Sequence, residues 1–152
     1  MIIPDANLLL YAYDSASPSH KSAASWWTQC LSGGEPVGLA PLVAFSFVRI
    51  GTNPRAFVDP MMPAEAANHV RSWLAQSNVE ILNSKPEHVR DVLSLIEALG
   101  TAGNLVSDAQ LAALAIDYDA TLHTADTDFL RFPNLKWFNP LTGARSKKGR
   151  TS

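Results

Sequence analysis

The chain has 152 residues, of which 47% are hydrophobic and 17% charged, and this balance predicts a single globular domain with a sizeable core. No apolar run approaches the roughly 20 residues of a membrane span, and no basic, apolar leader precedes the first strand pattern. The single cysteine, Cys30, excludes an internal disulfide. These features predict a cytoplasmic protein with no membrane contact.

The formal charge of −2 is distributed unevenly along the chain. Residues 142–152 hold Arg145, Lys147, Lys148 and Arg150 and no acid, so residues 1–141 carry the other 8 basic and all 14 acidic residues, a charge of −6. An acidic body is unlike a general nucleic-acid binder. We expect 1–141 to form the domain and 142–152 a disordered basic tail, which is either a solvated end or a weak RNA contact.

Hydrophobic periodicity predicts short strands that alternate with helices. The expected strands are 1–4, 37–40, 79–82, 120–123 and 135–138, and the expected helices are 7–13, 20–31, 41–50, 63–75, 86–99 and 108–118. Ser107 is the predicted N-cap of the last helix. This spacing predicts an α/β fold with a mostly parallel sheet covered by helices on both faces.

Four aspartates follow strand patterns or open a helix, the places where open parallel sheets bind ligands. Asp5 follows the first strand pattern, and Asp108 opens a helix. Asp126 and Asp128 follow the fourth strand pattern. Because carboxylate oxygens suit Mg²⁺ or Mn²⁺, we expect the four acids to share one metal pocket.

Each of these acids also has a structural alternative. Asp5 stands at a favoured N-cap position, and Asp126 and Asp128 fit a turn. Asp108 lies in the first turn of a helix, where a negative charge gains ~0.3–1 kcal/mol from the dipole. That position is also expected to lower its pKa and keep it ionised for a metal. Asp14 is interpreted mainly as a helix-end residue.

Four segments occur in an order that matches a known family. They are Asp5-Ala-Asn7-Leu-Leu-Leu-Tyr-Ala, Phe47-Val-Arg49-Ile-Gly-Thr52-Asn-Pro54-Arg55, Leu105-Val-Ser-Asp108-Ala-Gln-Leu-Ala-Ala-Leu-Ala and Thr124-Ala-Asp126-Thr-Asp128-Phe129. Residues 1–141 thereby resemble the PIN-domain family, and within it the VapC ribonuclease toxins of bacterial toxin–antitoxin pairs. The resemblance implies a PIN-like three-layer α/β/α sandwich. It also implies an endoribonuclease that depends on Mg²⁺ or Mn²⁺, forms a homodimer and is inhibited by a VapB-like antitoxin.

The resemblance also implies roles for the acids. Asp5, Asp108 and Asp126 match the catalytic metal ligands, and Asp128 matches the additional acid. The family pattern places a glutamate on the helix before Arg49, but Ser46 stands there. A neutral serine is a weak ligand, so the alternative is a degenerate, metal-poor module that binds RNA or a protein partner without cleavage.

Other polar residues are candidate substrate contacts. Arg49 and Arg55 bracket a helix break, and arginine suits phosphate, although an ordinary ion pair or a solvated side chain is the alternative. With Asn7 and Ser46 they are the predicted substrate-binding residues. The four histidines show no zinc spacing. The sequence leaves the RNA unspecified, because such choice depends on surface shape and single-stranded loops.

Overall fold

Five short strands form one parallel sheet in the computed structural model, which describes residues 1–147. The strands are β1 (Ile2–Pro4), β2 (Val37–Leu39), β3 (Val79–Ile81), β4 (Thr121–His123) and β5 (Lys136–Phe138). Their order in the sheet is β3-β2-β1-β4-β5, and every neighbouring pair is parallel. The expected parallel α/β sheet is confirmed.

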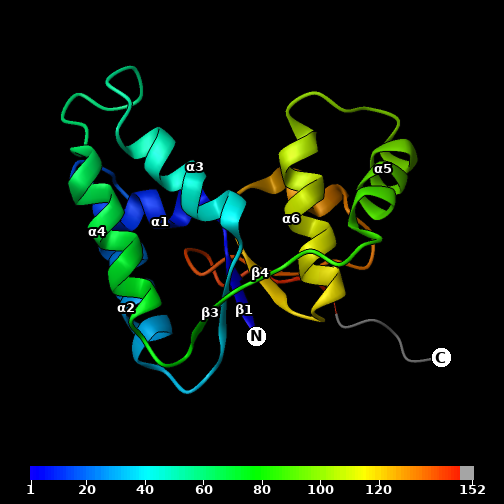
Figure 1. Ribbon diagram of the computed structural model, residues 1–152, viewed down its shortest axis with the longest axis horizontal. Coiled ribbons are helices and arrows are strands. Elements are labelled where there is room, and N and C mark those ends of the chain that lie inside the picture. The colour runs from blue at the N-terminus through cyan, green and yellow to red at the C-terminus, as the bar shows by residue number, and fades with distance from the viewer. Residues whose placement is uncertain (148–152) are drawn as a thin grey trace.

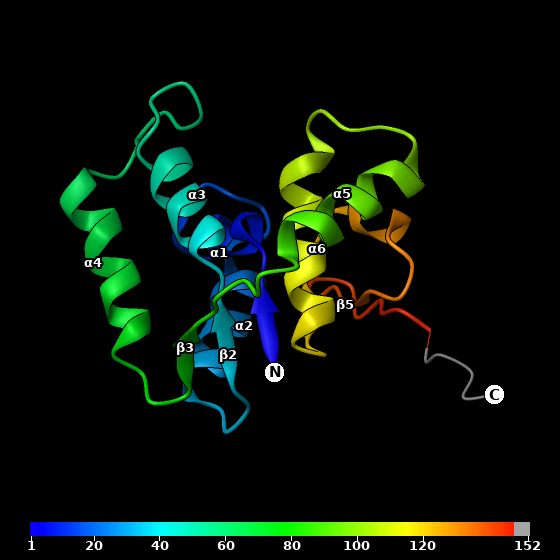
Figure 2. The same ribbon diagram turned by 45° about the vertical axis from the view of Figure 1, so that its right-hand side comes forward.

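Six helices and one short 3₁₀ helix connect the strands of the described chain. They are α1 (Ala6–Tyr13), α2 (His20–Ser32), α3 (Pro41–Gly51), α4 (Pro63–Leu74), α5 (His88–Leu99), α6 (Leu105–Asp117) and η1 (Thr127–Arg131). Figures 1 and 2 show α1–α4 on one side of the sheet and α5 and α6 on the other. Right-handed crossovers produce this arrangement, because the chain moves outward to β3 and then returns past β1 to β4. The expected three layers are confirmed. Within residues 1–147, none of the helices has the length and apolar character needed to span a bilayer.

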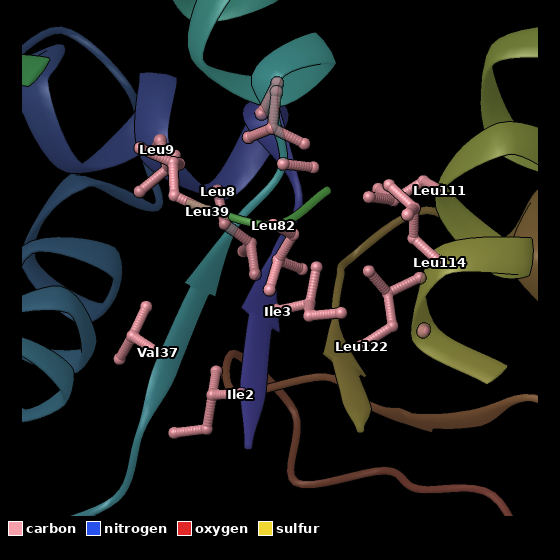
Figure 3. Close-up of a cluster of buried hydrophobic side chains, with 14 of the residues drawn as sticks. Ile2, Ile3, Leu8, Leu9, Val37, Leu39, Leu82, Leu111, Leu114 and Leu122 are labelled. Atoms are coloured by element: carbon pink, nitrogen blue, oxygen red, sulfur yellow. The ribbon is translucent and has the colours of Figure 1, made fainter. Parts of the chain in front are cut away.

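Branched aliphatic side chains fill the space between the layers, as expected for strands covered on both faces. Figure 3 shows those of the inner strands between α1 and α6. Ile3, Val37 and Leu122 are fully shielded from solvent. The helical partners in this cluster are Leu8 and Leu9 of α1 and Leu111 and Leu114 of α6. Three tryptophans, Trp26, Trp27 and Trp73, are also buried.

Helix α6 begins earlier than the sequence pattern suggested. Its N-cap is Asn104 and its first residue Leu105 is buried, so Ser107 is the third helical residue and the prediction that it caps the helix is wrong. The turn before the helix contains Gly103 at φ 62°, a conformation that glycine adopts without strain. Burial of Leu105 favours the earlier start, and Asp108 remains in the first turn.

The described part of the basic tail returns along β5. The Ser146 N–H donates to the Trp137 carbonyl at 2.9 Å, and Arg145 pairs with Phe138 in an antiparallel bridge. The Arg145 guanidinium also lies 5.1 Å from the centre of the Phe138 ring. Residues 142–146 make backbone or side-chain contacts of this kind, and the expected disorder of the tail stays a prediction. Residues 148–152, which the expected tail also includes, lie outside the described residues.

Candidate metal centre

Strands β1 and β4 place Asp5 next to Thr124 at the carboxyl edge of the sheet. Pro4 pairs with His123, and the Asp5 N–H donates to the His123 carbonyl at 2.9 Å. The Thr124 hydroxyl donates to Oδ2 of Asp5 at 2.8 Å. Asp5 occupies the N-cap position of α1 but makes no side-chain capping hydrogen bond. Helix capping therefore does not account for this buried carboxylate.

Helix α6 and η1 bring three further carboxylates together. One oxygen each of Asp108, Asp126 and Asp128 lies within 4.8 Å of the other two. Oδ1 of Asp126 accepts the Asp128 N–H at 2.9 Å and so caps η1. A carboxylate has further lone pairs, so Asp126 combines the expected turn role with a place in the acidic group.

Thr124 connects the two halves of the site, and the sequence reasoning did not identify it as a site residue. Its side chain is 2% exposed. Besides donating to Asp5, its Oγ1 accepts the Asp126 N–H at 3.0 Å. Threonine hydroxyls often bond the backbone two residues onward, so the Thr124-Ala-Asp126 spacing was the available signal. Thr124 holds two acids in one relative position.

Burial and mutual repulsion raise two pKa values in this group. Burial raises the pKa of Asp5 to about 6, against the effect of the Thr124 hydrogen bond, and the charge of Asp126 adds to the rise. Burial, followed by the charges of Asp126, Asp5 and Asp128, raises the pKa of Asp108 to about 6. The expectation that the helix dipole lowers the Asp108 pKa is wrong, because burial and three nearby carboxylates outweigh it.

These residues fit a hard divalent cation. The donors are all carboxylate oxygens, the ligands that Mg²⁺ and Mn²⁺ prefer. A bound cation would offset both the burial and the mutual repulsion that raise the two pKa values. Asp5 is not in the 4.8 Å group of described residues, but its charge acts on Asp108. The nearby His123 is engaged elsewhere: its Nδ1 accepts from Trp26 Nε1 at 3.0 Å, and burial lowers its pKa to about 4.

The other predicted substrate-binding residues come from α1, from α3 and from the loop after α3. Asn7 is exposed in the first turn of α1, Ser46 is half-buried on α3, and Arg49 and Arg55 are exposed at and after the end of α3. Their roles in binding RNA stay predictions. Asp14 is the C-cap of α1 and accepts the Ala16 N–H at 3.0 Å, in agreement with a helix-end role.

Thr124→Val is expected to lower the activity of this site by about 10- to 100-fold, the usual cost of removing a group that orients a metal ligand. The valine keeps the shape but cannot donate to Asp5, whose pKa should then rise above 6. The pH–rate profile should shift to higher pH, and Thr124→Ser should restore it. An unshifted profile with normal activity would contradict the linking role.

The chain belongs to the PIN domain family, because the family model of the PIN domain matches residues 2–135. It is similar to Ribonuclease VapC33 of Mycobacterium tuberculosis, with 47% identity over 141 residues, 93% of this chain and 99% of that protein. Ribonuclease VapC37 of the same organism is 37% identical over 140 residues, 92% and 97% of the two chains. The predicted resemblance to VapC ribonucleases is confirmed.

Solved structures show the same fold. The sarcin–ricin loop cleaving toxin VapC20 of Mycobacterium tuberculosis superposes with a TM-score of 0.66 at 15% identity, over 86% of this chain and 93% of that one. The chain matched in Rickettsia felis VapBC2, solved bound to a DNA fragment from their promoter, gives a TM-score of 0.64 at 21% identity, over 91% and 98%. At these identities the similarity supports the architecture alone.

Proposed function

We propose that this protein is a metal-dependent endoribonuclease, the toxin of a toxin–antitoxin pair. The observation that carries the proposal is the group of Asp108, Asp126 and Asp128, joined to Asp5 through Thr124. Two relatives named as VapC ribonucleases match almost the full length of this chain and are 47% and 37% identical to it over the matched residues. A group of carboxylates that can hold a divalent cation suits phosphodiester hydrolysis, because the cation activates water and stabilises charge on the phosphate.

The protein residues have separate tasks in this proposal. A bound Mg²⁺ or Mn²⁺ would supply Lewis acidity and an activated water. Asp108, Asp126 and Asp128 would hold the cation, and Asp5, ionised above pH 6, would complete its oxygen ligands. Arg49 and Arg55 are proposed to hold RNA phosphates. Cys30 is not a nucleophile, because burial, with a smaller contribution from Glu35, raises its pKa to about 12.

A small VapB-like antitoxin and a second copy of the chain are the proposed protein partners, and the cytosol is the proposed location. One chain in each of two VapBC structures, from Haemophilus influenzae and Salmonella typhimurium, shares the fold of this chain. Met61 and Met62 are proposed to supply apolar contacts to the antitoxin, and the two differ in exposure. Met62 is 72% exposed, whereas Met61 is half-buried and approaches Gly51.

The proposed activity is tested with purified, antitoxin-free protein and a structured RNA. Cleavage is expected in Mn²⁺, should stop in EDTA and should return when Mn²⁺ is added in excess. Gel electrophoresis of end-labelled RNA gives the readout. RNA that stays intact in Mn²⁺, while circular dichroism and thermal unfolding show a sound fold, would contradict the proposal.

A degenerate module without cleavage is the second candidate, favoured by Ser46 in place of the family glutamate. Ser46→Glu separates the two functions. For a working native site we expect less than about a threefold change in cleavage, because the four aspartates already provide more than the one or two carboxylates that commonly hold Mg²⁺. A large gain in both Mn²⁺ affinity and cleavage would instead identify the natural site as degenerate.

A further inference from the structure

Helix α3, whose N-cap lies level with Asp5 on the neighbouring strand, carries an exposed aromatic residue. Phe45 is 72% exposed, while every other phenylalanine and tryptophan in residues 1–147 is buried or half-buried. Its ring takes part in none of the ring contacts found among the described residues. The face of this ring is therefore free to stack on a base.

Phe45 belongs to a stripe with one positive charge. Pro41, Phe45 and Arg49 are exposed and spaced four residues apart, so they follow one face of α3. Arg49 is the only charged residue of this helix. A ring and a guanidinium on neighbouring turns match the two parts of a nucleotide, since bases stack on aromatic rings and phosphates pair with arginine.

The sheet places this stripe close to the acids. Ile2 of β1 pairs with Val37 of β2 in parallel register, which puts Asp5 level with Ala40, the N-cap of α3. Neighbouring strands are ~4.8 Å apart, and Phe45 lies five residues further, a helical rise of roughly 7 Å. Figures 1 and 2 show α3 and α6, which carries Asp108, facing each other from the two sides of this edge.

We propose that Phe45 stacks on a base of single-stranded RNA whose adjacent phosphate is held by Arg49. The inference rests on the proposed ribonuclease function and adds a positioning residue to it. The charge of α3 favours RNA, because the helix carries one arginine that can pair with a phosphate and no acid that would repel it. Stacking is tolerant of base identity, so Phe45 would orient the strand rather than choose its sequence.

The test measures binding of a fluorescein-labelled 12-nucleotide oligouridylate by anisotropy in EDTA, where no cleavage occurs. Phe45→Ala and Phe45→Leu should each weaken binding by about 5- to 100-fold, the range for loss of one stacked base. Phe45→Trp should stay within about twofold of the natural protein. Val89→Ala, which truncates an exposed residue of α5 in the other helical layer, is the matched control and should bind normally.

Salt dependence separates the two residues of the stripe. Arg49→Gln should reduce the slope of log affinity against log salt by about one unit, whereas Phe45→Ala should leave the slope unchanged. Normal binding by Phe45→Leu would overturn stacking. Normal RNA binding by Phe45→Ala, with weakened self-association or antitoxin binding, would also overturn it and assign the face to a protein. An unmutated protein that neither binds nor cuts RNA would instead refute the proposed function itself.

Discussion

Asp108→Asn is expected to lower RNA cleavage by more than about 100-fold. Removing even a group that only orients a metal ligand lowers metal affinity or activity by about 10- to 100-fold. The same substitution should raise the melting temperature of the metal-free protein by about 2–4 °C. This shift corresponds to a gain of about 1 kcal/mol in the free energy of unfolding for a chain of this size. The reason is that Asp108 is half-buried among Asp5, Asp126 and Asp128, whose charges destabilise its ionised form. Activity and stability should therefore change in opposite directions.

Calorimetry in EDTA and cleavage assays in Mn²⁺ measure the two effects on the same preparations. Asp59→Asn is the matched control, because Asp59 is an exposed loop acid outside the acidic group, and it should change neither quantity. A protein that loses activity and also melts lower would indicate that Asp108 stabilises the fold, and it would contradict the electrostatic interpretation.

The affinity for Mn²⁺ is expected to fall about 100-fold between pH 7 and pH 5. Metal ligands must be deprotonated, and the pKa values of both Asp5 and Asp108 are raised to about 6. Each group contributes about a tenfold loss across this interval. Asp5→Asn should reduce the pH effect to about tenfold, which isothermal titration calorimetry at constant ionic strength can measure. An affinity for Mn²⁺ that stays constant from pH 7 to pH 5 would contradict the raised pKa values and would favour a lowered pKa for Asp108.

Stability without metal should respond to pH with opposing contributions. Asp5 and Asp108 have higher pKa values in the folded protein than in the unfolded chain, where both are near 4. They therefore stabilise the fold most at a pH below about 4, and this contribution is lost as the pH rises through 6. The pKa of His123 is lowered to about 4, so its contribution is present above 6.5 and is lost as the pH falls toward 4. Metal affinity is therefore a clearer measure of the acidic group than stability alone.

The sequence alone was sufficient to predict the layered fold and the family. The alternation of short strands and helices requires parallel pairing, and this pattern is visible in one dimension. The four acids could also be picked out, because strand ends and helix starts carry local signals such as the Asp5-Ala-Asn7 and Asp126-Thr-Asp128 segments. Local patterns therefore gave the elements and the types of residue at their ends.

Only the tertiary structure decided how these residues act on one another. Thr124 bonds Asp5 across 119 positions of sequence, because β4 adds beside β1 after the chain has passed through β2 and β3. Likewise, the pKa of Asp108 is raised by burial and then by the charges of Asp126, Asp5 and Asp128, which together outweigh the dipole of its own helix. Distances and burial arise from the order of strands in the sheet, and periodicity reports only which face of an element is apolar.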